Sequence, residues 1–146
     1  MKDLLLRLVA TDRKYSDIAI LFLRLLLGGM MLTHAWSKMI SFVTLSTVFP
    51  DPLGIGSQLS LGLVLFAEIG CSLLLILGCL TRLAILPLMF DMIVVLFMID
   101  TTATFYQKEL PLLYLGMSIV LLWTGAYRYS LDTMIRKKLI RSEMIE

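Results

Sequence analysis

Three charged side chains interrupt long apolar runs of the sequence, and they are Arg24, Glu68 and Asp91. A charge near the middle of a bilayer costs roughly 2.5–3.5 kcal/mol on insertion scales, so each of these side chains needs a partner, a water-filled cavity or a proton. Because each lies in a different run, we expect three helices to meet around the trio. Two acids and one base leave one negative charge uncompensated, which predicts a shared proton or a bound group at this buried polar site.

Two interpretations of this trio stay open from the residues alone. In the first, the trio forms ion pairs between the helices that fix their register. In the second, it is a site for a polar headgroup or a proton-transfer step, because ionisable residues inside a membrane are functional candidates.

A second set of polar residues marks the opposite ends of the apolar runs. We expect His34, Lys38, Asp100 and Glu109 to form an outer-mouth cluster, either as solvated helix ends or as a proton donor and acceptor group around the single histidine. One histidine with two carboxylates is a weak basis for a transition-metal site, and no metal is predicted. The sequence carries no phosphate-binding loop, dinucleotide fingerprint or haem-binding cysteine pair, so no intrinsic cofactor is predicted.

Four apolar runs must position these side chains. The predicted membrane spans are residues 18–36, 59–80, 83–99 and 110–126. About 20 residues at ~1.5 Å each cross the hydrocarbon core. Composition agrees, since 59% of the residues are hydrophobic and the mean hydropathy is +0.91, against roughly 45–50% apolar residues in soluble domains. The sequence therefore predicts an all-α protein, an integral membrane four-helix bundle that forms one domain over residues 1–146.

Helical spacing and turn lengths predict how these spans pack. Arg24, Gly28 and Ala35 recur on one face of the first span, so Arg24 should point into the bundle, where small residues let another helix approach. Thr81 and Arg82 alone separate the second and third spans, which predicts a tight antiparallel hairpin with Arg82 in its inner turn.

The remaining connections are predicted from their polar and turn-forming residues. Prolines and glycines between residues 50 and 56 exclude regular helix. Residues 101–109 are predicted to be a polar loop, and Pro111 to lie in the first turn of the last span.

The distribution of basic residues predicts the topology. The N-terminal segment, the tail and the inner turn hold ten lysines and arginines, whereas the two other connections hold one each. Because basic residues accumulate on the cytoplasmic side, both termini and Arg82 are predicted to be cytoplasmic.

Short motifs recur along the chain in a fixed order. They are Arg24-Leu-Leu-Leu-Gly28, His34-Ala-x-x-Lys38, Ala67-Glu68, Leu77-Gly78-x-x-Thr81-Arg82, Glu109, Leu113-Tyr114, Gly125 and Tyr129-Ser130-Leu131-Asp132. With them the chain resembles the DoxX family of small bacterial membrane proteins over roughly residues 18–132. It departs from that pattern at Ala35, where the family usually has glycine, and at Ala126-Tyr127, where the family often has Pro-Gly.

The resemblance implies a four-helix, multi-pass protein of the bacterial inner membrane with a link to oxidoreductase systems. Relatives resemble the small membrane subunit of a thiosulfate:quinone oxidoreductase, and others are associated with thiol and oxidative-stress partners. By position, the resemblance implies roles for Arg24, His34, Lys38, Glu68, Arg82 and Glu109.

We therefore expect an accessory or quinone-site subunit of an oxidoreductase system. A quinone is the candidate ligand, and the expected partners are the lipid bilayer and either a protein of a membrane redox complex or a second copy of the chain. Nucleic acid is not an expected partner. The alternatives are a non-catalytic assembly subunit and a small oligomeric transporter.

Overall fold

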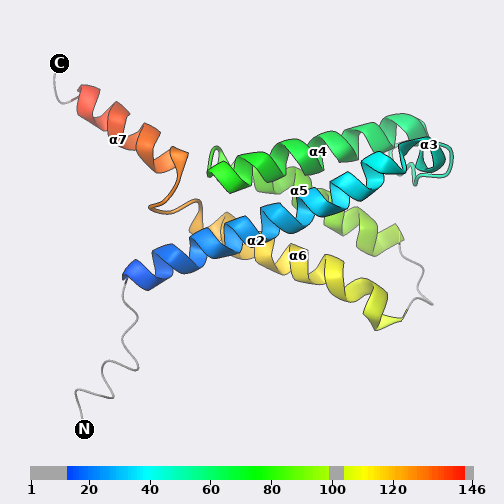
Figure 1. The fold of residues 1–146 in the computed structure, drawn as a ribbon, viewed down its shortest axis with the longest axis horizontal. Helices are drawn as coiled ribbons and strands as arrows, with labels where there is room; N and C mark the ends of the chain where they lie inside the picture. The colour runs from blue at the N-terminus through cyan, green and yellow to red at the C-terminus, as the bar shows by residue number, and fades with distance from the viewer. Residues whose placement is uncertain (1–12, 99–103, 144–146) are drawn as a thin grey trace, which may run out of the picture.

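The computed structural model describes residues 13–98 and 104–143, and helices make up most of this part of the chain (Figure 1). The helices are α2 (Arg13–Ile40), α3 (Phe42–Leu45), α4 (Ser57–Leu77), α5 (Thr81–Met98), α6 (Phe105–Thr124) and α7 (Leu131–Glu143). Three of the described helices are long and apolar enough to cross a membrane, namely α4, α5 and the Tyr15–Ile40 part of α2. The predicted all-α class is confirmed.

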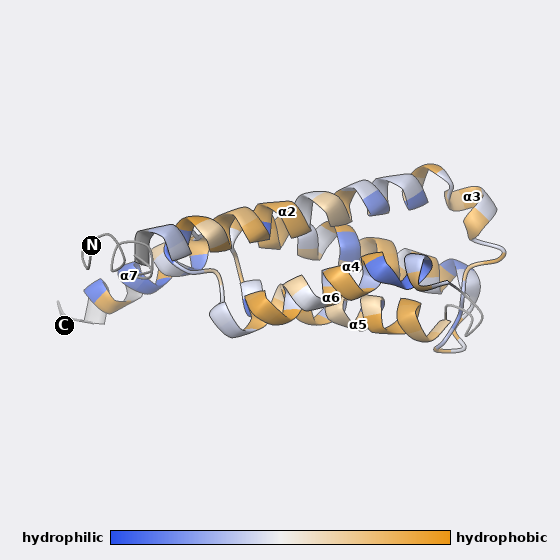
Figure 2. Ribbon diagram, turned by 90° about the horizontal axis from the view of Figure 1, so that it is seen from below, coloured by the Kyte–Doolittle hydropathy of each residue, from blue (hydrophilic) through white to orange (hydrophobic). Residues whose placement is uncertain are grey.

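Four long helices lie alongside one another in the structure. Helix α4 packs against α2 and α5, and α6 packs against α5 and α2. The short helix α3 lies at one end, whereas α7 extends from the end at which α2 begins (Figures 1 and 2). Apolar residues dominate α4, α5 and most of α6, and hydrophilic residues gather on α7 (Figure 2). The polar side chains described below are thus enclosed among apolar helices.

Glycine decides how closely α2 and α4 approach. A Cβ atom on Gly28 would lie 2.8 Å from Ile76 Cγ1 and 3.0 Å from the Ser72 carbonyl oxygen, so a larger residue would force the helices apart. Arg24 and Ala35 on the same face of α2 are buried, as their spacing predicts.

The hairpin between α4 and α5 is built by a glycine turn and a side-chain cap. Helix α4 ends at Leu77 and is followed by Gly78, whose φ of +69° favours glycine, and the Cys79 N–H donates to the carbonyl of Leu74 in a Schellman arrangement. The Asp132 carboxylate accepts from the backbone N–H groups of Leu80 (2.7 Å) and Thr81 (3.1 Å), which caps the first turn of α5. The predicted tight hairpin is confirmed, but its turn is formed by residues 78–80, and Thr81 and Arg82 already belong to α5.

Several helix ends differ from their predicted positions. Helix α2 continues past residue 36 to Ile40, and α4 stops at Leu77 instead of residue 80. Helix α6 already begins at Phe105, so part of the predicted 101–109 loop is helical and Pro111 lies beyond the first turn. Helices α2 and α6 include polar residues because a helix continues as long as its backbone hydrogen bonds are made, whereas hydropathy reports only where side chains prefer lipid. Helix α4 stops early because Gly78 adopts a left-handed conformation.

The start of α4 is organised by Asp51. Its carboxylate accepts from the N–H groups of Ile55 (3.0 Å) and Gly56 (2.7 Å) and from the Ser60 hydroxyl (2.8 Å). These donors hold the turn that follows Pro50 and Pro52 against the first turn of α4, so the predicted non-helical stretch is confirmed and has a defined shape.

We expect the contribution of Asp51 to stability to depend on pH. Hydrogen bonds from Gly56, Ser60 and Ile55 hold the pKa of Asp51 below its ordinary value of 3.8. A depressed pKa stabilises the fold at pH values above 3.8 and loses this effect as the pH falls through the folded-state value. The thermal midpoint of Asp51→Asn should thus lie below that of the wild type at about pH 6, and the difference should shrink as the pH falls through the folded-state pKa of Asp51. A constant difference across this range would contradict the assignment.

Candidate functional site

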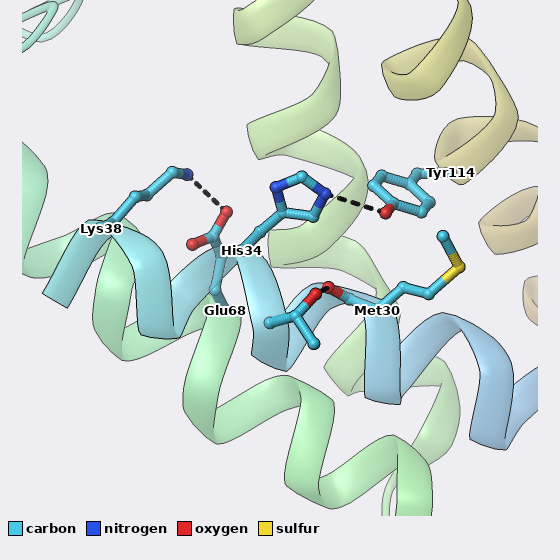
Figure 3. A network of polar contacts seen from close by, with 6 residues as sticks. Met30, His34, Lys38, Glu68 and Tyr114 are labelled. Atoms are coloured by element: carbon cyan, nitrogen blue, oxygen red, sulfur yellow. Dashed lines mark hydrogen bonds and ion pairs between the residues drawn. The ribbon is translucent and has the colours of Figure 1, made fainter. Parts of the chain in front are cut away.

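A buried ion pair joins α2 to α4 (Figure 3). Lys38 Nζ donates to Glu68 Oε1 at 2.6 Å, and the exposed fractions of the side chains are 24% for Lys38 and 1% for Glu68. The contact exists because α2 remains helical to Ile40, which places Lys38 on the helix instead of in a loop. The pair is a charge-assisted hydrogen bond inside a low-dielectric bundle, where such bonds are strongest.

A second polar contact lies one helical turn away on α2. His34 Nε2 and the Tyr114 hydroxyl are 3.0 Å apart, and the two rings meet edge to face with centroids 5.6 Å apart. Lys38 lies within electrostatic reach of His34, and Glu68 within reach of Tyr114. The view in Figure 3 places the imidazole between the ion pair and the phenol, so the two contacts belong to one site.

The carboxyl group of Asp91 completes this polar network from α5. Glu68 lies nine residues before the end of α4, and Asp91 lies ten residues after the start of α5, so the hairpin brings them to the same level. Asp91 is 6% exposed and close enough to interact directly with Glu68. Neither Glu68 Oε2 nor Asp91 Oδ2 has a hydrogen-bond partner among the described residues.

A cavity of about 270 Å³ adjoins the network between α4, α5 and the turn that precedes α4. Its walls are almost entirely apolar, and Ser60 and Asp91 are their polar members. The lining residues are Phe49, Pro50, Pro52, Leu53, Ser60, Leu63, Val64, Ala67, Phe90, Asp91, Val94, Val95 and Met98. Asp91 is the member of the polar network that reaches this apolar cavity, and apolar walls with few polar groups are typical of ligand sites.

Arg24 does not join the two acids, which corrects the predicted trio. Its guanidinium donates to the carbonyl oxygens of Ala126 (2.8 Å), Tyr129 (2.8 Å) and Ile76 (3.4 Å). Arg24 lies 14 residues before Lys38 on α2, which is ~21 Å along a helix axis. In the antiparallel pair, Arg24 thus faces the end of α4, and Lys38 takes the place opposite Glu68.

The residues of the predicted outer-mouth cluster that the structure describes are not gathered in one place. His34 and Lys38 belong to the buried network. Glu109 is exposed on α6 and forms no ion pair with another described residue. Asp100 lies outside the described residues. Proximity to a span end in sequence was thus a poor guide to proximity in space.

Arg82 was predicted to lie in the inner turn, but it is the second residue of α5 and follows a turn made by residues 78–80. It does not take part in the polar network. Its Nη2 donates to the Trp123 carbonyl oxygen at 3.4 Å, and it lines an open pocket together with Arg136 of α7. Its observed contacts link α5 to the end of α6, which is a structural role.

Sequence reasoning did not single out Tyr114 as a site residue. It had two signals: its place in the Leu113-Tyr114 motif, and a helical spacing that puts Tyr114, Ser118 and Leu121 on the buried face of α6. Within the described part of the chain, no three histidine, cysteine, aspartate or glutamate side chains are grouped so that they could hold a metal ion. The polar groups of the network are an ammonium, an imidazole, a phenol and two carboxyl groups, all of which can donate or accept hydrogen bonds and protons.

A protein-family model described as DoxX matches residues 19–101 of the chain, which is more than half of its length. The matched part contains His34, Lys38, Glu68 and Asp91, and it ends before α6, which carries Tyr114. Searches of curated proteins and of solved structures found no match.

Proposed function

The chain belongs to the DoxX family of membrane proteins, and we propose that it is an accessory or quinone-site subunit of a bacterial inner-membrane oxidoreductase system, linked to thiol, sulfur or oxidative-stress chemistry. The observation that carries this proposal is the partly buried network of His34, Tyr114, Lys38, Glu68 and Asp91, which reaches an apolar cavity through Asp91. A quinone site needs polar groups that bond to the headgroup oxygens and exchange protons, together with apolar walls for the ring and tail.

In the proposed arrangement, α6 is the fourth span of a four-helix bundle that forms a single domain. Its residues after Glu109 are mostly apolar, and Tyr114 faces inward from it. The beginning of α2 and the basic helix α7 lie at the same end of the bundle (Figure 2). Because basic residues gather on the cytoplasmic side, we assign this end, including both termini, to the cytoplasm.

The site residues have different roles in this proposal. His34 and Tyr114 can bond to a headgroup oxygen in place of each other, and Lys38 is the counter-ion of Glu68. Glu68 and Asp91 are the proton acceptors. The chain binds and orients the headgroup, and a partner subunit carries the electrons.

The test is purification of the tagged protein from its native membrane in a mild detergent, with mass spectrometry of the retained proteins, lipids and quinones. We expect a redox subunit and a quinone to co-purify with the wild type. Glu68→Gln should retain the subunit and lose at least about tenfold of the quinone, because hydrogen bonds to a charged group are worth about 1.5–3 kcal/mol. The matched control is Glu109→Gln, an exposed carboxyl group that should leave both unchanged.

Other outcomes would contradict specific parts of the proposal. A redox subunit without any quinone would favour the assembly-subunit alternative. A homo-oligomer with neither partner nor quinone would favour the transporter alternative. Equal quinone content in the wild type and Glu68→Gln would remove Glu68 from the site.

A further inference from the structure

An open pocket of about 510 Å³ lies where the turn between α4 and α5 meets the segment between α6 and α7. The two parts of its wall are far apart in the sequence, and the Asp132 carboxylate joins them by accepting from the backbone N–H groups of Leu80 and Thr81. The sequence motifs that end at Arg82 and at Asp132 therefore meet at this pocket, and the network described above uses neither of them. Its volume is in the range of ligand sites, which is about 300–1,000 Å³.

The backbone of both wall segments is held in an unusual conformation. Among the described residues other than glycine, Leu80 and Tyr127 have positive φ angles, +48° and +56°, and both line this pocket. Such angles cost conformational energy in a residue with a Cβ atom, and they gather at functional sites. Arg24 holds the second segment through the carbonyl oxygens of Ala126 (2.8 Å) and Tyr129 (2.8 Å), so this wall is fixed before a ligand arrives.

The charged side chains of the pocket favour an anion. Arg82 and Arg136 are exposed and line it from α5 and α7, and neither forms an ion pair with another described residue. A guanidinium carries several N–H donors, and one of those of Arg82 reaches the Trp123 carbonyl oxygen at 3.4 Å. Asp132 is the acid of the same wall, but both of its carboxylate oxygens already accept backbone N–H groups. Two exposed guanidinium groups against one bonded carboxylate are suited to a phosphate group.

The surroundings of the pocket place it at a membrane surface. Helix α5 is long and apolar enough to cross a membrane, and Arg82 is its second residue. Leu80 and Leu83 of the wall are 55% and 61% exposed, and the adjacent Trp123 is 79% exposed. Tryptophan is enriched at the level of the lipid headgroups, and exposed leucines beside it offer a surface for acyl chains. A phosphate bound here thus fits the headgroup of a lipid.

We propose that this pocket binds the phosphate group of an anionic phospholipid between the guanidinium groups of Arg82 and Arg136. The acyl chains of the lipid extend along α5 past Leu83. A free phosphate ion shares the headgroup chemistry but gains nothing from the exposed apolar side chains. The pocket is separate from the network around Glu68, and the inference does not depend on the proposed redox function.

The test titrates the full-length protein, purified in a non-ionic detergent, with dioctanoylphosphatidylglycerol and with dioctanoylphosphatidylcholine, and native mass spectrometry counts the bound lipids. We expect the wild type to bind the anionic lipid at least about tenfold more tightly than the zwitterionic lipid, because both arginines attract its net charge. Inorganic phosphate is then added as a competitor. At a concentration equal to that of the anionic lipid it should displace little of it, since it lacks acyl chains.

Two arginine variants locate the headgroup. Arg82→Gln and Arg136→Gln should each weaken binding of the anionic lipid about fivefold. Arg136→Gln keeps the test independent of folding, because Arg136 is exposed and forms no ion pair with another described residue. Arg141→Gln is the matched control, an exposed arginine of α7 that does not line the pocket, and it should bind as the wild type does.

Several results would overturn the inference. Equal affinity of the wild type for the two lipids would show that the headgroup charge is not recognised, and unchanged binding in Arg82→Gln and Arg136→Gln would place the lipid elsewhere. An equal loss in Arg141→Gln would mean that the net charge of α7 attracts the lipid without a defined site. Displacement of the lipid by an equal concentration of inorganic phosphate would make the pocket a site for a free anion.

Discussion

Lys38→Met is expected to lower the free energy of unfolding by about 3–5 kcal/mol, because it leaves the Glu68 carboxylate buried without its counter-ion. Glu68 is almost fully buried, and the described ion pairs give it Lys38 as its partner. The cost follows from burying an unpaired charge, and not from the attraction within the pair, which desolvation largely offsets. The measurement is a reversible unfolding titration in mixed micelles, followed by circular dichroism.

The double variant Lys38→Met with Glu68→Gln separates the cost of an unpaired buried charge from the loss of the attraction within the ion pair. Neutralising both groups removes the buried charge, so most of the lost stability should return. Lys108→Met is the control, since Lys108 forms no ion pair with another described residue, and a substitution of this kind should change stability by no more than about 0.5 kcal/mol. If Lys38→Met is as stable as the control, or if the double variant is no more stable than Lys38→Met, then Lys38 does not compensate a buried charge on Glu68.

The closeness of Glu68 and Asp91 was within reach of sequence reasoning, because a tight hairpin fixes which residues of its two helices lie at the same level. The ion-pair partner of Glu68 could not be predicted from the sequence. Hydropathy ended the first span at residue 36 and assigned Lys38 to the outer surface, whereas the helix continues to Ile40 and directs Lys38 at α4. A preference for water is a property of a side chain, and helix continuation is a property of the backbone, so the first does not determine the second.

Arg24 was misassigned for a different reason. Its burial was predicted correctly from helical spacing, but a buried arginine was expected to seek the nearest carboxylate. Its actual acceptors are main-chain carbonyl groups, and two of them, Ala126 and Tyr129, belong to the segment between α6 and α7. Every residue carries a carbonyl group, so the sequence cannot mark which ones an arginine will reach.

Arg24→Met is the second substitution with a large expected effect, a loss of about 3 kcal/mol or more in the free energy of unfolding. It removes the donors to the Ala126 and Tyr129 carbonyl groups, and an unsatisfied buried acceptor costs about 1–3 kcal/mol. Arg24→Lys should fall between Arg24→Met and the wild type, since one ammonium cannot reproduce the planar fork of a guanidinium. Arg136→Met, an exposed arginine of α7, is the matched control.

Hydrogen exchange is the measurement that locates the loss of stability in Arg24→Met. The side chains of Arg24 and Ser130 both lie against Gly78. Arg24 is also within electrostatic reach of Asp132, whose carboxylate caps the first turn of α5. Loss of the arginine should therefore release this cap and speed exchange of the Leu80 amide, whereas Lys38→Met should act at the opposite end of the bundle and leave that amide protected. The same exchange rate at Leu80 in both variants would mean that the bundle responds as one unit, and that Arg24 does not organise the inner hairpin.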